Sequence, residues 1–183
     1  GFDGTDKIVM DYDKKKIRKL DNRINKMHRK LSKHKEDSNN SVKARTKLEQ
    51  SYLNRTNYQE DEIKKLASFL VKKYDYVTLE GLRMGFVFKN KNLSKKAGEK
   101  MFYKAKEIIT RKFNEYGKKV YELDKTFPST QMCSKCGHIL KKEEKMKLSN
   151  RIYECNHCGL TINRDENAAR NIYFSPHKTE IIL

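Results

Sequence analysis

The chain has 183 residues and carries 42 Lys and Arg against 24 Asp and Glu, which gives a formal net charge of +18. Only 36% of its residues are hydrophobic, so the core must be thin and much of the surface must be solvated or meet an anion. No apolar run of about 18 residues is present, which excludes a membrane span, and we expect no signal peptide. The charge favours a polyanionic partner, most simply nucleic acid, with a basic but merely solvated surface as the alternative.

The first predicted element is an amphipathic helix over residues 14–35. Apolar residues recur there at steps of three and four, from Ile17 to Leu31, while eleven residues are Lys or Arg and Asp21 is the one acid. We predict that the apolar seam packs on a neighbouring helix and that the basic face contacts nucleic-acid phosphates, although this face could also be only solvated. The residues predicted to make these contacts are Lys14, Lys15, Lys16, Arg18, Lys19, Arg23, Lys26, Arg29, Lys30 and Lys33.

The rest of the chain alternates predicted helices and strands. The elements are a turn at 36–41, a helix at 42–73, a strand at 74–80, a helix at 98–116, a strand at 118–124 and a final helix at 165–174. The first two helices should pair as an antiparallel hairpin across the short turn. Tyr52 and Phe102 are predicted to lie on buried helix faces. This order of elements predicts an α/β protein.

The four cysteines fall in one window, as two C-x2-C pairs with 18 residues between them. Cys133 and Cys136 form the first pair, within CSKCG, and Cys155 and Cys158 form the second, within CNHCG. Two thiolates at this spacing can grip one ion when the backbone turns toward the sulfurs, and the following Gly permits that turn. This spacing predicts a zinc ribbon with one structural Zn²⁺. Two disulfides are the alternative, and they would require an oxidising compartment.

Two acidic residues stand at the ends of predicted elements. Glu80 ends an apolar strand, and Asp165 begins the final helix. Metal-dependent phosphodiester cleavage needs carboxylates from separate elements, brought together around two Mg²⁺ ions about 4 Å apart. Either residue also has a simpler explanation, because an acid after a strand is often only solvated and an acid in a first helical turn serves the helix dipole.

The motifs around these residues resemble the TnpB family of transposon-encoded, RNA-guided DNA endonucleases, which are related to the compact type V CRISPR effectors. The basic helical hairpin before Glu80 stands where that family has one, and the resemblance covers nearly the whole chain. The similar segments are YVTLEGL at 76–82, FPSTQMCSKCG at 127–137 and NRDENAARNI at 163–172.

The resemblance implies an RNase H-like fold of the type called RuvC, with an inserted four-cysteine zinc ribbon. It implies that Glu80 and Asp165 are catalytic and bind Mg²⁺, and that Arg164 and Asn167 support the site. The partners would be DNA and a guide RNA. The protein would act in the cytoplasm and would be encoded by a prokaryotic cell, a phage or a mobile element. The implied division is part of the core with the hairpin (about 14–73) at 1–125, the ribbon at 126–162, and the last RuvC motif with its helix at 163–183.

The start of the chain departs from the family pattern. The family's first motif is a Gly-Ile-Asp-x-Gly segment on a central strand, and GFDGTDKIVMD at 1–11 invites that match. However, Asp3-Gly4 resembles a hairpin turn, with the next strand at 8–10, just before the basic helix. We therefore expect a core that is incomplete at its N-terminus, without the first catalytic Asp, and a chain that is inactive alone; Asp3 is the candidate substitute. A second hypothesis is a non-catalytic zinc-ribbon protein that binds nucleic acid without cutting it.

Overall fold

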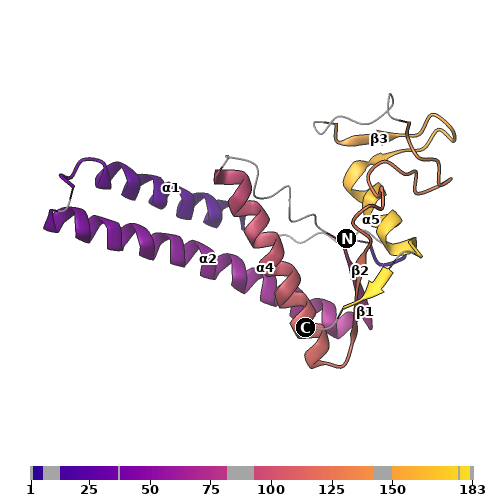
Figure 1. Ribbon diagram of the computed structural model, residues 1–183, viewed down its shortest axis with the longest axis horizontal. Coiled ribbons are helices and arrows are strands. Elements are labelled where there is room, and N and C mark those ends of the chain that lie inside the picture. The colour runs from indigo at the N-terminus through magenta and orange to yellow at the C-terminus, as the bar shows by residue number, and fades with distance from the viewer. Residues whose placement is uncertain are drawn as a thin grey trace.

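The computed structural model describes residues 2–5, 13–36, 38–81, 93–141, 150–176 and 178–181, with the side chains of 93–100 excepted. The described residues have a mixed α/β architecture, as the sequence predicts, and they form two small sheets (Figure 1). The strand that the sequence predicts at 8–10 lies outside the described residues. Within those residues, no helix is both long and apolar enough to cross a membrane.

Two long helices, α1 (Lys14–Leu31) and α2 (Asn39–Lys73), form the predicted antiparallel hairpin and project as an arm from the sheet (Figure 1). Asp13 caps α1 by accepting a hydrogen bond from the backbone N–H of Lys16, at 2.9 Å. Ser38 caps α2 in the same way through the N–H of Ser41. Because of this cap, α2 begins at Asn39, so the second half of the predicted turn is helical instead.

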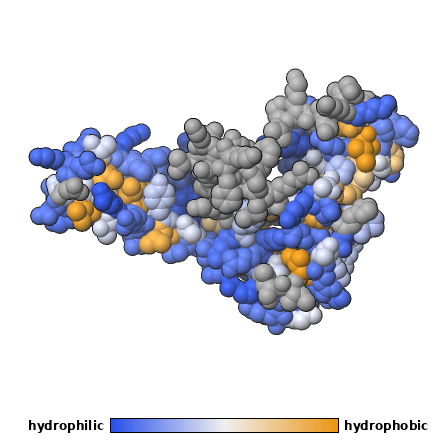
Figure 2. Space-filling model, in the orientation of Figure 1, coloured by the Kyte–Doolittle hydropathy of each residue, from blue (hydrophilic) through white to orange (hydrophobic). Residues whose placement is uncertain are grey.

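The seam of α1 faces α2 as predicted, and its basic side faces solvent. Ile24 is buried, and the other apolar residues of the seam are half-buried. All ten basic residues that were assigned to nucleic-acid contact are exposed. The face of the arm shown in Figure 2 is accordingly mainly hydrophilic, with hydrophobic patches between.

The main core lies where α2 meets a three-stranded sheet and helix α4 (Leu93–Glu115). The sheet consists of β1 (Tyr76–Leu79), β2 (Lys119–Leu123) and β5 (Lys178–Glu180), in the order β1-β2-β5. β1 and β2 are parallel, and β5 is antiparallel to β2. The buried residues of this core are Ile63, Ala67, Val71, Ile108, Ile109, Phe113 and Val120.

Three details of the fold differ from the sequence prediction. Tyr52 and Phe102 are 46% and 45% exposed, because each lies at the margin of its helix's apolar stripe. The helix predicted at 98–116 begins five residues earlier, at Leu93. The short strand β5 was not predicted, since its sequence, Lys-Thr-Glu, is polar and lacks alternation.

The cysteine region forms a second, smaller unit next to the last helix. Strands β3 (Ile152–Glu154) and β4 (Thr161–Asn163) pair antiparallel, and α5 (Arg164–Phe174) follows β4 directly. Cys133, Leu140, Tyr153 and Cys155 form a separate buried cluster. Figure 1 shows α5 between this unit and the three-stranded sheet. The RNase H-like arrangement implied by the resemblance needs further strands and stays a prediction.

Candidate functional site

The four cysteines converge at one point, as their spacing predicts. Their sulfur atoms all lie within 4.8 Å of one another, and all four are free thiols. The Sγ atoms of Cys133 and Cys158 are 3.6 Å apart, and those of Cys136 and Cys155 are 3.7 Å apart. A disulfide needs an S–S length of about 2.05 Å, so the alternative of two disulfides is wrong. The cluster can hold a metal ion such as zinc.

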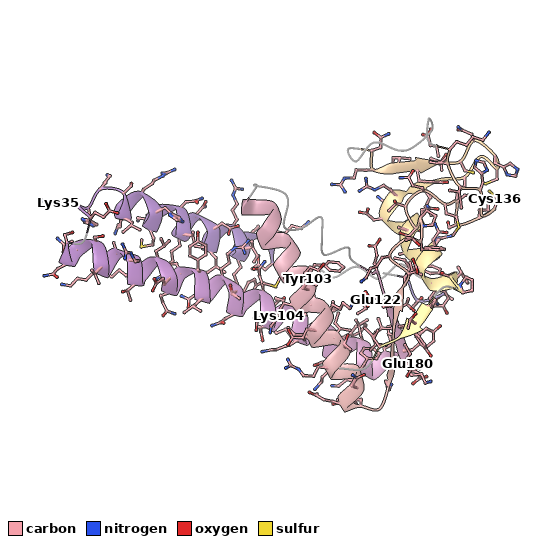
Figure 3. The ribbon with its side chains drawn as sticks, viewed as in Figure 1. Lys35, Tyr103, Lys104, Glu122, Cys136 and Glu180 are labelled. Atoms are coloured by element: carbon pink, nitrogen blue, oxygen red, sulfur yellow. The ribbon has the colours of Figure 1, made fainter. Side chains whose placement is uncertain are left out.

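The local backbone explains why the sulfurs meet. Each C-x2-C pair with its following Gly forms a tight turn, called a knuckle. In each knuckle the Gly adopts the left-handed conformation, with φ of +75° at Gly137 and +71° at Gly159. The N–H of Gly137 then donates to the carbonyl of Cys133, and that of Gly159 donates to the carbonyl of Cys155. Both turns therefore close tightly beneath a pair of thiols. Figure 3 shows Cys136 in the ribbon, at the opposite end of the molecule from Lys35 at the tip of the arm.

The surroundings of the cluster affect how its groups ionise. At Cys155, burial acts to raise the pKa, but hydrogen bonds from the backbone N–H groups of Cys158 and His157 and from neighbouring thiols outweigh it and lower the pKa. Burial also raises the pKa of Tyr153, and nearby cysteine charge raises it further, so this fully buried phenol stays neutral. Tyr153 shares a buried cluster with Cys133 and Cys155, and its hydroxyl donates to the carbonyl of Gln131 at 3.5 Å.

Glu80 lies immediately after the carboxyl end of β1 and is exposed. The hydroxyl of Ser129 donates to Glu80 Oε1 at 3.3 Å. A Cβ on the next residue, Gly81, would lie 2.3 Å from the carbonyl oxygen of Leu123, so only glycine permits this close passage beside β2. The close contact between Gly81 and the end of β2 therefore helps to position the backbone next to Glu80.

Asp165 lies in the first turn of α5. Asn163 caps this helix, and its Oδ1 accepts from the N–H of Asp165 at 2.9 Å and from that of Glu166 at 3.3 Å. The Asp165 side chain is 68% exposed, and two guanidinium groups lie near its carboxylate: Arg164 at 3.4 Å and Arg151 at 3.9 Å. The predicted neighbour Arg164 thus contacts Asp165, and Arg151 is an additional one that the sequence did not indicate.

Asn167 is completely buried, and its contacts are not with Asp165. Its side-chain amide donates to the carbonyl of Met132 at 2.7 Å and accepts from the N–H of Ser134 at 2.9 Å, so it grips the backbone on both sides of Cys133. One turn further along α5, Asn171 donates to the carbonyl groups of Ser129 and Met132. The predicted role of Asn167 in supporting the catalytic site therefore stays a prediction. Its hydrogen bonds in the structure hold the first knuckle.

Asp3 occupies a different place from the other two acids. Its carboxylate accepts a hydrogen bond from Tyr74 Oη at 2.9 Å, and Lys73 Nζ lies 3.6 Å away. Tyr74 precedes β1, whereas Glu80 follows it, and a strand rises about 3.3 Å per residue. Within the described ranges, the four cysteines are the only group of three or more His, Cys, Asp or Glu side chains that lie close enough together to share an ion. This placement does not favour Asp3 as the missing ligand.

The chain is similar to several known proteins. Residues 102–172 match the family model described as Cas12f1-like, TNB domain. The chain is 31% identical over 150 residues to a "putative RNA-guided DNA endonuclease" of Streptomyces pristinaespiralis. The aligned segment covers 82% of this chain and 36% of that protein. It is 31% identical over 123 residues to TnpB-like protein L79 of Acanthamoeba polyphaga mimivirus, which covers 64% of this chain and 22% of that protein.

A shorter match extends to a CRISPR-associated protein. Cas12f1 of Sulfoacidibacillus thermotolerans, named an endodeoxyribonuclease, is 38% identical over 71 residues, or 39% of this chain and 16% of that protein. These matches place the chain in a class of proteins whose named members include RNA-guided DNA endonucleases. More narrowly, the chain belongs to the TnpB family. It spans only about a third of the length of the Streptomyces relative.

Proposed function

We propose that this chain is the C-terminal part of an RNA-guided DNA endonuclease and contributes Glu80 and Asp165 to a RuvC-like site for Mg²⁺-dependent phosphodiester cleavage. One observation carries the proposal. Ser129 donates to Glu80, and its own carbonyl is held by Asn171, on the helix whose first turn presents Asp165. Two exposed carboxylates from distant parts of the sequence are thereby attached to one connected framework.

In this proposal Glu80 and Asp165 bind Mg²⁺ beside the scissile phosphate. Bound Mg²⁺ would activate a water molecule and stabilise the leaving oxygen. Carboxylate oxygens are suitable ligands, and the exposure of both side chains leaves them accessible. Arg164 and Arg151 offset part of the negative charge at Asp165 and supply cations for a nearby phosphate.

For the cysteine cluster we propose structural zinc. A tetrahedral ion with Zn–S bonds of about 2.3 Å places the sulfurs about 3.8 Å apart. The separations of 3.6 Å between Cys133 and Cys158 and of 3.7 Å between Cys136 and Cys155 agree with that value. Four thiolates complete the tetrahedron and leave no open position, so the zinc would hold the ribbon rather than take part in cleavage.

The RNase H-like core is supported by a groove along β1. The groove has a volume of about 460 Å³ and follows the strand from Tyr74 to Leu79. Leu70 of α2 and Ile172 of α5 are among the residues that line it, and Phe2 and Asp3 at the start of the chain line it as well. An occupant would therefore meet apolar side chains from several elements. Strands of parallel sheets have this environment. We propose that the groove receives the central strand that bears the first catalytic Asp.

DNA and guide RNA are the proposed partners, and the arm is the proposed surface for their backbone. Phosphate contacts position a nucleic acid without reading its bases, which suits the exposed Lys and Arg residues of α1. The relatives' names support this choice of partners, since two of them are called RNA-guided or CRISPR-associated nucleases.

The direct test is Mn²⁺ binding by the purified chain, followed by paramagnetic broadening in NMR spectra. We expect the amide signals next to Glu80 and Asp165 to broaden together at the same Mn²⁺ concentration. Glu80→Gln and Asp165→Asn should each weaken broadening at both places. Broadening at one residue alone, or at neither, would contradict a shared site.

The second candidate is a non-catalytic protein that binds nucleic acid through its arm and ribbon. It is favoured because, within the described ranges, neither Glu80 nor Asp165 belongs to a group of three or more side chains close enough to share a metal ion. Under this alternative, the two Mn²⁺ responses would be absent while binding to nucleic acid persists.

A further inference from the structure

The loop from Ser129 to Ser134 connects three features that the sequence keeps apart: Glu80, the first zinc knuckle and helix α5. Ser129 is 3% exposed, donates through its hydroxyl to Glu80 and accepts at its carbonyl from Asn171. Further along the loop, Asn167 holds the carbonyl before Cys133 and the N–H after it. The loop is thus fixed at both ends by side chains of one helix.

The two asparagines leave little freedom in this arrangement. Both N–H bonds of the Asn171 amide are directed at carbonyl groups, those of Ser129 and Met132, at 2.8 and 2.7 Å. Asn167 donates on one side and accepts on the other, so a flipped amide would face oxygen with oxygen and N–H with N–H. Both side chains are almost completely buried, where an unpaired polar group is costly.

In contrast to the buried asparagines, Asp165 at the start of α5 is presented to solvent. Loop and carboxylate are therefore held by the same rigid helix, and Asn163 fixes the backbone of Asp165 at its start. A displacement of the Cys133 knuckle would be passed through Asn167 to α5, and through Ser129 to Glu80.

We propose that Ser129 is a positioning residue for Glu80, and that the Asn167–Asn171 clamp couples metal occupancy of the cysteine cluster to the placement of the two carboxylates. The inference rests on the proposed function for its consequence, because only a metal site at Glu80 and Asp165 would make the coupling useful. The coupling itself requires no cleavage. Outer partners of a metal ligand commonly change metal affinity 10- to 100-fold when removed.

The test uses the zinc-loaded chain and the side-chain carboxyl ¹³C signal of Glu80, assigned with Glu80→Gln. We expect removal of zinc by a chelator to shift this signal. In Ser129→Ala the signal should start from a shifted position and lose most of its response to zinc removal, with zinc content still at about one equivalent. Ser129→Thr, which retains the hydroxyl, should restore the response.

Asn171→Asp provides a second route, since it keeps the shape of the side chain but has no N–H to donate. It should shift the Glu80 signal as Ser129→Ala does. Ser51→Ala is the matched control: Ser51 is also buried, but its hydroxyl bonds within α2, to the carbonyl of Lys47. It should leave Glu80 unchanged. A Glu80 signal that ignores Ser129→Ala, or that responds to zinc removal equally in that variant, overturns the inference.

Mn²⁺ titration separates this inference from the proposed function. If Mn²⁺ binds at Glu80 and Asp165, Ser129→Ala should raise the midpoint of that titration about tenfold. If Mn²⁺ does not bind but the zinc-dependent shift of Glu80 is present, the clamp stands and the catalytic proposal fails. If Mn²⁺ binds equally well to Ser129→Ala and to the unaltered chain, the clamp fails and the catalytic proposal stands.

Discussion

At the scale of single residues, the four cysteines were the most predictable part of the molecule. A C-x2-C-G knuckle is a local structure, since its turn is set by a few consecutive residues and a left-handed Gly. Ser129 and Asn171 could not be found in the same way. Their hydrogen bonds join residues 49 and 42 positions apart, and neither residue stands out in composition or spacing.

The first prediction concerns the metal. Purified chain should contain one zinc ion, and Cys155→Ser should lose it and unfold the ribbon, because an incomplete tetrahedron forfeits much of a binding free energy of roughly 10 kcal/mol. His157→Ala changes an exposed residue in the same knuckle and should retain the metal. Metal analysis by mass spectrometry measures both. Zinc well below one equivalent in the unaltered chain would rule out the structural role.

At the scale of elements, hydrophobic periodicity predicted the helices and the packing of the first two, but not which residues at the edge of each apolar face are covered. Steps of three and four placed the seam of α1 correctly, and Ile24 is buried against α2. The same reasoning put Tyr52 and Phe102 inside, because periodicity gives a face and not the width of the partner that covers it. The parallel pairing of β1 and β2 depends on how α4 connects the two strands, and the pattern of residues within each strand does not reveal it.

The second prediction compares two phenylalanines of α4. Phe113 is fully buried and should destabilise the chain by about 3–5 kcal/mol when changed to Ala. Phe102 is 45% exposed, and Phe102→Ala should cost about 1 kcal/mol or less. Denaturant unfolding followed by circular dichroism gives both values. Equal effects would mean that the core does not centre on Phe113.

The third prediction concerns the basic face of α1. Changing Lys15, Lys19 and Lys26 together to Gln should weaken binding to duplex DNA and reduce its salt dependence. Each lost phosphate contact lowers the slope of log affinity against log salt by about 0.9. The control is Lys104→Gln with Lys112→Gln, since these lysines already pair with Glu107 and Glu115. Fluorescence anisotropy at several salt concentrations decides the matter, and an unchanged slope in the triple variant would leave the face merely solvated.

At the scale of the whole molecule, the parts are connected mainly through α5. It contacts β1 on one side and both strands of the ribbon on the other, and it supplies Asp165 and the two buried asparagines. The family could be identified from motifs, and its nuclease core was an expectation from that resemblance. What the motifs could not provide was the groove along β1, because it is lined by residues of α2, β1, α4 and α5 together with Phe2 and Asp3.

The last prediction follows from that groove. We expect the 183-residue chain alone to show little or no Mg²⁺-dependent DNA cleavage, although Glu80 and Asp165 are both present. A two-metal site needs a carboxylate that bridges both ions, and two acids provide too few ligands to fix the second ion. The strand proposed to occupy the groove would supply that carboxylate and would also support β1, which within the described residues pairs only with β2.

A longer form that carries such a strand should cut DNA, and Glu80→Ala or Asp165→Ala should each abolish cutting while zinc content and nucleic-acid binding stay nearly unchanged. Incubation with single-stranded DNA and Mg²⁺ or Mn²⁺ measures this directly. If the chain alone cuts and Asp165→Ala removes that activity, the bridging carboxylate lies within it, and Asp3→Ala becomes the next variant to make, despite the contacts of Asp3 with Tyr74 and Lys73.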